Sequence, residues 1–333
     1  MFAYIVRRLL MSVPLLVVIS FIVFFLSRAG GRDPVSAIVG ERASAEARER
    51  AVREFGLDKP LIVQYGRYLA GIVTRGDFGV SYVNQGRSVS RQLATYLPPT
   101  IELTLAALLI ALAAGVAAGV LSAVYARTWV DYLATGISLF GVSIPVFWLG
   151  LLLILAFGQW LPYGGNLDPT LEVPRRTGFM ILDCALSGDG GALRDALLRL
   201  VLPACTLATI PLAMTARITR ASMLEVLGSD YVRTARAKGL APFHVVMKHA
   251  FRNALIPVVT LVGLEFGYLL GGAVLTETVF AWPGMGSFLV ASVLDSDPMS
   301  VCGAAMVITA LFILVNLAVD VMYAFIDPRI HYA

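Results

Sequence analysis

Long apolar stretches recur along this 333-residue chain and are separated by shorter polar segments. Three windows, residues 103–126, 132–167 and 298–319, contain no charged residue. An apolar helix of roughly 18 residues or more is long enough to cross the hydrocarbon core of a bilayer. The pattern therefore predicts several membrane-spanning helices and excludes a soluble protein.

Six spans fit this pattern, which predicts an all-α polytopic membrane protein with six transmembrane helices. The predicted spans cover approximately residues 9–27, 100–124, 132–157, 197–217, 254–276 and 299–325. Several prolines fall inside them and are expected to be tolerated because neighbouring helices satisfy the freed backbone groups. These are Pro14, Pro145, Pro203, Pro211 and Pro257. Gly115 and Gly119 form a small-residue pattern that predicts close helix packing.

Composition agrees with a membrane location. Hydrophobic residues make up 58% of the chain and charged residues 14%, whereas soluble domains carry about 25% charged residues. The formal net charge is +4. Because most basic residues lie beside apolar spans, they indicate membrane orientation, and no nucleic-acid partner is expected.

The N-terminal segment predicts the orientation of the first span. Arg7 and Arg8 precede an apolar run from Leu9 to Leu26. This run is longer than the roughly 7–15 residues of a signal-peptide core, and no Ala-x-Ala cleavage site follows. We therefore expect an uncleaved span with a cytoplasmic N-terminus, and six crossings then place the C-terminus in the cytoplasm.

Charge asymmetry between the loops supports this orientation. Residues 217–252 carry seven basic residues against two acidic ones, whereas residues 277–297 carry three acidic residues and no basic one. Segments rich in Lys and Arg stay on the cytoplasmic side. Residues 217–252 are therefore predicted to be cytoplasmic and residues 277–297 extracytoplasmic.

Residues 28–98 fall on the outer side in this scheme, although they contain eleven basic and seven acidic residues. Loops longer than about 60 residues are translocated largely regardless of charge. Residues 45–55 predict a helix with Ser44 as its cap and Gly56 as its stop, and residues 61–73 predict an amphipathic helix. The expected organisation is an N-terminal transmembrane helix (1–27), an extracytoplasmic helical segment (28–98) and a five-helix permease core (99–333) with a cytoplasmic loop at about 218–252.

The residues that enzymatic chemistry needs are not grouped in this sequence. The three histidines form no His-Glu-x-x-His motif, and the three cysteines have no metal-ligand spacing. The sequence contains no Gly-Lys pair and hence no P-loop to bind ATP. We predict no catalytic residue, no metal site and no cofactor in this chain. If nucleotide hydrolysis energises it, the ATPase is another protein.

Residues 229–242 predict a two-turn helix on the cytoplasmic side. Ser229 or Asp230 can cap its start, Lys238 suits its last turn, Gly239 suits a left-handed stop and Pro242 prevents continuation. So short a helix is marginal by itself, so we expect it to pack against another element. The alternative is a solvated basic loop that only fixes topology.

The faces of this helix follow from its period. Tyr231, Ala235 and Lys238 are predicted to share one face, and Val232 and Arg236 another. We expect Ala235 and Ala237 to let a partner approach closely, with the basic residues pairing with acidic groups of that partner.

The stretch SMLEVLGSDYVRTARAKGL (222–240) resembles the cytoplasmic coupling loop of permeases in binding-protein-dependent ABC importers, and more narrowly that of the dipeptide and oligopeptide subfamily. Other matching stretches are GLDKPLIVQY (56–65), GDFGVS (76–81), TGFMILD (177–183), HAFRNALIPVVT (249–260), LTETVFAWPGMG (275–286) and DPRI (327–330). The chain departs from the general pattern where Arg233-Thr234-Ala235 replaces Glu-Ala-Ala. Pro257 also lies further from Gly239 than in sugar importers.

This resemblance implies the type I ABC-importer permease fold in the cytoplasmic (inner) membrane and transport of dipeptides or short oligopeptides by alternating access. It implies a second homologous permease subunit, two ATPase subunits that bind ATP and Mg²⁺, and an extracytoplasmic substrate-binding protein. It also implies that the coupling residues are Asp230, Tyr231, Arg233, Thr234, Ala235, Arg236, Ala237, Lys238 and Gly239. Related permeases carry nickel or other small solutes, so these stay possible as cargo.

Carboxylates inside the spans are the candidates for a transport pathway, because a charge within the membrane is costly and is usually functional. Glu265 falls near the middle of the fifth span and is our candidate for lining the pore; the alternative is that it pairs with a polar group of the second permease. Asp320 lies near the inner end of the sixth span, where a structural role is expected. An ion-coupled secondary transporter is a weaker alternative, since no internal repeat is visible.

Overall fold

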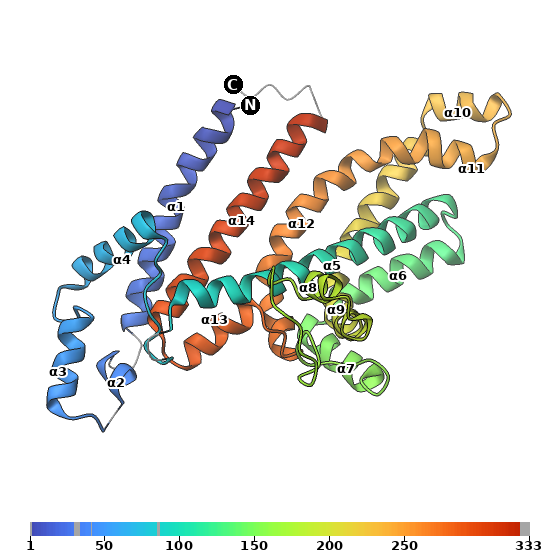
Figure 1. The fold of residues 1–333 in the computed structure, drawn as a ribbon. Helices are drawn as coiled ribbons and strands as arrows, with labels where there is room; N and C mark the ends of the chain where they lie inside the picture. The colour runs from blue at the N-terminus through green and yellow to red at the C-terminus, as the bar shows by residue number, and fades with distance from the viewer. Residues whose placement is uncertain (1, 30–33, 41, 85–86, 327–333) are drawn as a thin grey trace. The chain divides into compact units, whose positions relative to one another are not determined.

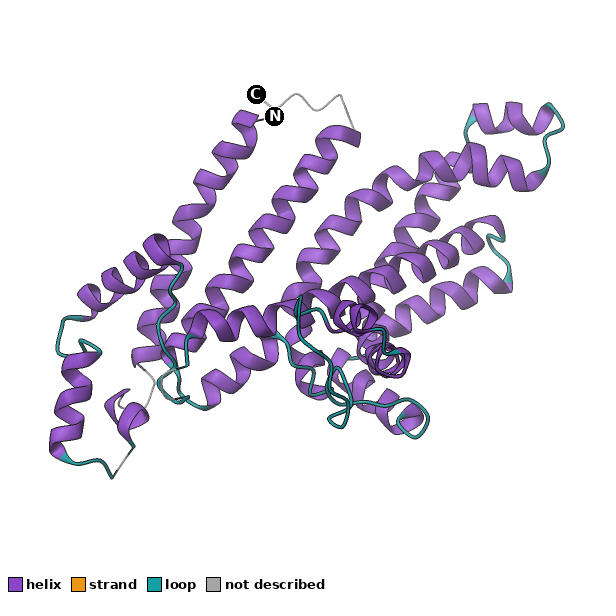
Figure 2. Cartoon of the chain, viewed as in Figure 1, coloured by secondary structure: helices purple, strands orange, loops and turns teal. Residues whose placement is uncertain are grey.

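The structure is a computed structural model that describes residues 2–29, 34–40, 42–84 and 87–326. These residues are mainly helical (Figure 2), and the one bridge of β type among them joins Val80 and Ser88. The chain divides into two units, one of Met1–Thr100 with Pro283–Leu314 and the other of Ile101–Trp282 with Val315–Ala333. The motif at residues 327–330 lies outside the described residues.

Four helices in the described ranges are long and apolar enough to cross a membrane by themselves (Figure 1). They are α1 (Phe2–Ala29), α5 (Val89–Val124), α9 (Gly190–Leu227) and α14 (Pro298–Ile326). Two further pairs of apolar segments qualify if each bent pair counts as one span. The six predicted spans are confirmed in that sense.

The third predicted span is a broken helix rather than a straight one. It consists of α6 (Trp129–Ser143) and α7 (Val146–Phe157), which meet at 109°. Pro145 stands at the break and disfavours helical backbone at the residue before it, where Ile144 is extended. Pro145 thus lies inside the predicted span but at a break between two helices, whereas Pro14, Pro203, Pro211 and Pro257 lie inside helices.

The fifth predicted span corresponds to α12 (Arg252–Val279), which is preceded by the short α11 (Pro242–His244) and the π-helix η1 (Val245–Phe251). The stretch Pro242–Val259 meets Gly263–Gly271 at 42°. Little of residues 218–252 is therefore irregular loop.

The fourth predicted span, residues 197–217, is the middle of a much longer helix. The carboxylate of Asp189 caps α9 by accepting hydrogen bonds from the backbone N–H groups of Gly191 and Ala192. The helix then continues to Leu227. Charged residues at its two ends mark where the apolar stretch stops, but charges exposed to water do not interrupt a helix, so α9 extends beyond the apolar part.

In the first unit, the helices predicted after the first span are present. They are α3 (Ala45–Glu54) and α4 (Leu61–Arg75), accompanied by α2 (Pro34–Val39) and α13 (Met285–Leu294). The hydroxyl of Ser44 accepts a hydrogen bond from the N–H of Ala47 at the start of α3, and Gly56 beyond its end has φ of 62°. The predicted cap and stop are both confirmed.

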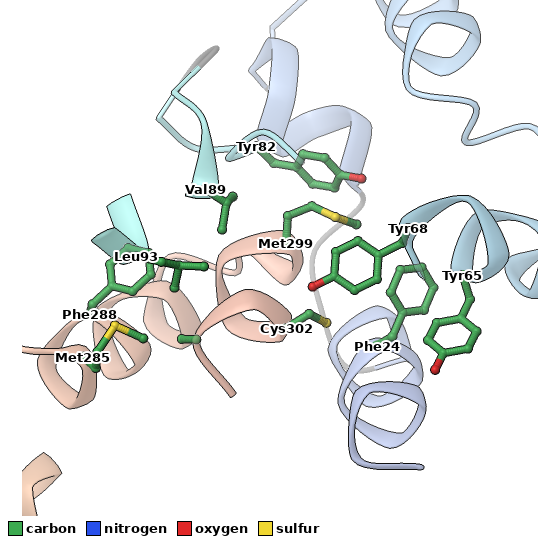
Figure 3. Packing of buried hydrophobic residues seen from close by; sticks show 11 residues of the cluster. Phe24, Tyr65, Tyr68, Tyr82, Val89, Leu93, Met285, Phe288, Met299 and Cys302 are labelled. Carbon is green, nitrogen blue, oxygen red and sulfur yellow. The ribbon is translucent and has the colours of Figure 1, made fainter. Parts of the chain in front are cut away.

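An aromatic cluster holds α4 against α1 in this unit (Figure 3). Phe24 of α1 lies against the rings of Tyr65 and Tyr68, with centroid distances of 5.4 and 5.8 Å. The hydroxyl of Tyr65 also donates to the carbonyl of Val17 at 2.9 Å. Met299 and Cys302 of α14 belong to the same buried cluster.

In the second unit, α5 and α9 pack closely at two glycines. A Cβ atom at Gly115 would lie 2.8 Å from Thr215 Cβ, and one at Gly119 would lie 2.5 Å from Thr219 Cβ. No side chain fits at such distances. The predicted small-residue contact is confirmed, and it brings α5 against the helix that leads to the predicted coupling helix.

Candidate functional site

The predicted coupling helix is present as α10 (Asp230–Ala237), which lies beside α11 in Figure 1. Gly239 has φ of 75°, the left-handed conformation expected at the stop, and Pro242 begins α11. Ser229 occupies the cap position, but its side chain makes no cap bond and donates instead to the carbonyl of Val226 at 2.6 Å. Backbone geometry and glycine therefore delimit this helix more than a side-chain cap does.

One side of α10 is buried against its own unit. Val232 is fully buried and Ala235 is 6% exposed, and both belong to a cluster with Val245 of η1. Residues three apart on a helix share a face, so Val232 and Ala235 form the inner side. The prediction that α10 packs against another element is confirmed. The expectation that Ala235 lets a partner approach closely is wrong, because the contact with η1 covers Ala235.

The opposite side of α10 is exposed, and together with Lys238 it carries three basic residues against one acidic residue. Its exposed residues are Asp230, Tyr231, Arg233, Thr234, Arg236, Ala237, and beyond them Lys238 and Gly239. Arg233 and Asp230 form an ion pair at 3.4 Å, but both side chains are largely in water, where such a pair contributes little. Arg236 and Lys238 have no acidic partner among the described residues. The surface is thus able to pair with acidic groups of another protein.

An exposed apolar group next to α10 was missed by the sequence reasoning. Leu240, Phe243 and Met247 are 42%, 72% and 39% exposed. Large apolar side chains grouped on a surface outside the membrane mark contact sites for other proteins. These large apolar residues lie in the basic segment 217–252, which is predicted to be cytoplasmic. Because such a segment contacts no lipid tails, their presence could have indicated a protein contact.

A second group of polar residues joins three elements near the start of α6. The carboxylate of Asp131, 3% exposed, accepts hydrogen bonds from Arg220 of α9 at 2.7 Å (Nε) and 2.8 Å (Nη2). It also accepts from the hydroxyl of Ser122 on α5 and from the backbone N–H of Arg127 in the α5–α6 turn. We call this group the Asp131–Arg220 fork. This group was not predicted from the sequence. Asp131 only preceded the uncharged window 132–167, and Arg220 was only one of the basic residues in 217–252 that indicated membrane orientation.

A third polar group orders the segment between α7 and α9. The guanidinium of Arg199 pairs with Asp195 at 2.8 Å and Asp168 at 2.9 Å and donates to the carbonyl of Gly164 at 2.8 Å. Hydrogen bonds from Thr170, together with Arg199, hold the pKa of Asp168 below its usual value. This segment is therefore pinned to the first turns of α9.

Asp183 in α8 (Met180–Ser187) pins the neighbouring stretch. Burial raises the pKa of Asp183, but hydrogen bonds donated by Thr177 and by the N–H of Gly178 outweigh it and leave the pKa lowered from 3.8. Close by, the N–H of Ile181 donates to Glu102 of α5 at 2.8 Å. Buried carboxylates thus accept from backbone groups that have no helical partner.

Glu265, the candidate for the pore, lies in α12 and is 8% exposed. Among the described residues its carboxylate forms no ion pair and no hydrogen bond with another side chain. No group of three or more His, Cys, Asp or Glu residues in the described ranges is arranged to hold a metal ion.

Comparison with known families decides what these elements belong to. The family described as "Binding-protein-dependent transport system inner membrane component" matches residues 115–332, and its N-terminal companion matches residues 1–104. The chain belongs to this family. It is therefore a multi-pass inner-membrane component of a transport system.

Named relatives match over nearly the whole length. The "Di/tripeptide transport system permease protein" of Pseudomonas aeruginosa is 44% identical, covering 100% of this chain and 99% of the relative. The "Dipeptide transport system permease protein" of Alkalihalophilus pseudofirmus is 42% identical, with 100% of both covered. The "Probable D,D-dipeptide transport system permease protein" of Escherichia coli is 45% identical, covering 93% and 92%. The matched range 115–332 includes α10, the fork and Glu265.

Proposed function

We propose that this chain is a transmembrane permease subunit of an ATP-driven importer for dipeptides or short oligopeptides, and that α10 is its coupling helix. The observation that carries the proposal is α10 itself, which is seated on η1 by Val232 and Ala235 and exposes a basic face and Phe243 beside it. The family match supports transport, and the names of the relatives support peptide cargo.

The seating of α10 makes it suitable as a rigid lever. It follows α9 after only two residues, Gly228 and Ser229, and it contacts η1, which runs into α12. A push on its outer face is therefore passed to two membrane helices rather than absorbed by a flexible loop. Packed elements respond to such a push by shifting as rigid bodies.

The partners follow from what the chain itself supplies. The chain has no P-loop, so two ATPase subunits would bind ATP and Mg²⁺ and dock on α10 and on its counterpart in a second, homologous permease. An extracytoplasmic binding protein would deliver the peptide. Closure of the ATPases would then switch the transport pathway between a conformation open to the outside and one open to the cytoplasm.

The docking surface can be tested with two matched substitutions. Phe243→Asp places a charge in the exposed apolar group, whereas Val73→Asp places one at an exposed apolar residue of α4, 83% exposed. Neither change fills or empties a core. We expect Phe243→Asp to remove the ATPases from the purified complex and Val73→Asp to leave them bound. Retention of the ATPases by Phe243→Asp would contradict docking at this surface.

The transport activity is tested in vesicles that contain both permeases and both ATPases, with the binding protein outside. Uptake of a labelled dipeptide should require ATP and the binding protein together. Uptake of nickel ions without peptide uptake would identify the alternative cargo. Peptide uptake driven by an ion gradient without ATP would overturn the ATP-driven mechanism.

A further inference from the structure

The Asp131–Arg220 fork lies between the predicted coupling helix and the first half of the broken span. Arg220 is two turns before the end of α9 at Leu227, and α10 begins three residues after that end. Asp131 is in the first turn of α6. A displacement that travels from α10 along α9 therefore reaches the fork before it reaches any other described ion pair of α9.

Two of the contacts between α6 and α9 can be located on both helices. One is the fork, and the other is Gly141, where a Cβ atom would lie 2.8 Å from Thr209 Cγ2. The spacing is ten residues along α6 and eleven along α9, which corresponds to about 15–17 Å of helix in both. The two contacts are thus spaced alike along both helices.

A cavity lies along α6 and α9 beside the fork. Its volume is about 470 Å³, and it is lined by α6 from Asp131 to Val142, by α9 from Ala213 to Ala221 and by part of α5. Many of the lining side chains are alanine, glycine or serine. The fork is a charged contact that ties this end of α6 to α9 beside the cavity.

The chemistry of the fork suits a contact that has to survive movement. A guanidinium that donates two parallel hydrogen bonds to one carboxylate fixes both distance and orientation. Asp131 is buried, whereas the side chain of Arg220 is 35% exposed, so separation of the pair would leave a carboxylate without its charge partner in a buried position. Movement of α9 with α6 attached avoids that penalty.

We propose that Asp131 and Arg220 are positioning residues that make α6, and α7 beyond the break, follow α9 when the coupling helix is displaced. The inference rests on the proposed function. Without the Asp131–Arg220 fork, α10 and α9 would still respond to the ATPases, but α6 would not follow them. Hydrolysis would continue while peptide movement failed.

The test uses vesicles with the complete complex and measures three quantities: peptide uptake, ATP hydrolysis with and without binding protein, and the melting temperature of the complex. Asp131→Asn and Arg220→Lys should leave stimulated hydrolysis within about twofold of wild type, while uptake per ATP falls roughly tenfold, within the usual range of coupling effects. Ser138→Ala is the control, since Ser138 lines the same cavity but bonds only within α6. Its uptake per ATP should not change.

A second arm separates positioning from folding. In a chain whose three native cysteines are replaced by alanine, Asp131→Cys and Arg220→Cys are combined, and a short bis-methanethiosulfonate reagent links the two thiols. The linked and the unlinked complexes both lack the Asp131–Arg220 ion pair. Any effect on folding of losing that pair is therefore the same in both. We expect the linked complex to recover uptake per ATP relative to the unlinked one.

The outcomes are distinct. Unchanged uptake per ATP in Asp131→Asn and Arg220→Lys overturns the inference, as does equal uptake per ATP in the linked and unlinked cysteine pair. If wild-type vesicles take up no peptide, the proposed function fails and this inference fails with it. Wild-type transport with a loss of coupling that the linker reverses supports both.

Discussion

Asn253 at the start of α12 donates a hydrogen bond from its Nδ2 to the hydroxyl of Tyr231 on α10, at 2.8 Å. The residues are 22 positions apart in sequence. The bond adds a polar tie to the apolar seat formed by Val232 and Val245, so α10 is held to the element that leads into α12 on two sides. Because α10 also follows α9 directly, a force on it reaches two membrane helices.

Burial of Ala235 predicts that its substitution affects stability rather than docking alone. Ala235→Arg forces a long charged side chain against Val245, and overpacking alone costs about 1–3 kcal/mol. Ala237→Arg introduces the same side chain at an exposed position of the same helix. The melting temperature of the purified complex should fall for Ala235→Arg and stay constant for Ala237→Arg. Equal melting temperatures would show that α10 is not seated as described.

The left-handed conformation of Gly239 predicts a strong effect of a β-branched residue. Gly239→Val places a Cβ where φ is 75° and costs about 1–2 kcal/mol locally. No atom lies within 4 Å of the added Cβ, so conformation rather than crowding is tested. Uptake and binding-protein-stimulated hydrolysis should both fall, whereas Gly239→Asn, which tolerates this conformation, should retain most of both. Wild-type values for Gly239→Val would exclude α10 as the coupling element.

The lowered pKa of Asp183 predicts a pH-dependent order of its loop. The folded state binds the proton less readily than the unfolded one, so the stabilisation is present above the ordinary pKa of 3.8 and is lost as pH falls through the lower folded value. Hydrogen–deuterium exchange of residues 176–184 should be slow and constant from about pH 7 to 5, after correction for intrinsic rates. Asp183→Asn should speed exchange at neutral pH, with the difference narrowing in acid. No effect of Asp183→Asn would contradict the assigned role.

Glu265 is predicted to line the transport pathway, and its neutral analogue tests this. A carboxylate beside the pathway attracts the ammonium groups of peptides, so Glu265→Gln should reduce uptake of lysine-containing dipeptides more than that of neutral ones. Assembly with the second permease should be unaffected. Loss of assembly instead would place Glu265 in the contact between permeases.

The orientation of the spans is predicted from charge and can be measured by thiol labelling in a cysteine-free background. Pro60→Cys and Leu294→Cys should react with an impermeant reagent added outside cells, and Leu240→Cys should react only after permeabilisation. Leu294 and Leu240 are 79% and 42% exposed, so lack of reaction reports location rather than burial within the chain. Reversed labelling would overturn the topology and the cytoplasmic placement of α10 together.

Much of the fold could be predicted because its causes are local in sequence. A bilayer requires long apolar helices, so the spans follow from hydropathy. The end of α10 follows from Gly239, since few other residues accept its backbone conformation. Gly115 and Gly119 likewise predicted a close helix contact, although they did not identify the partner helix.

The remaining features depend on residues that only the folded chain brings together. Asp131 and Arg220 are 89 positions apart, and nothing in either neighbourhood identifies the other as its partner. Pro145 was expected to be tolerated inside its span, and the break of 109° between α6 and α7 depends on how both pack. The sequence by itself determined that long apolar helices form and that α10 stops at Gly239, because transfer into lipid and backbone conformation are decided locally. Tertiary structure decided that Ala235 faces inward and that Asp131 of α6 pairs with Arg220 of α9, because burial and ion pairing depend on distances between helices.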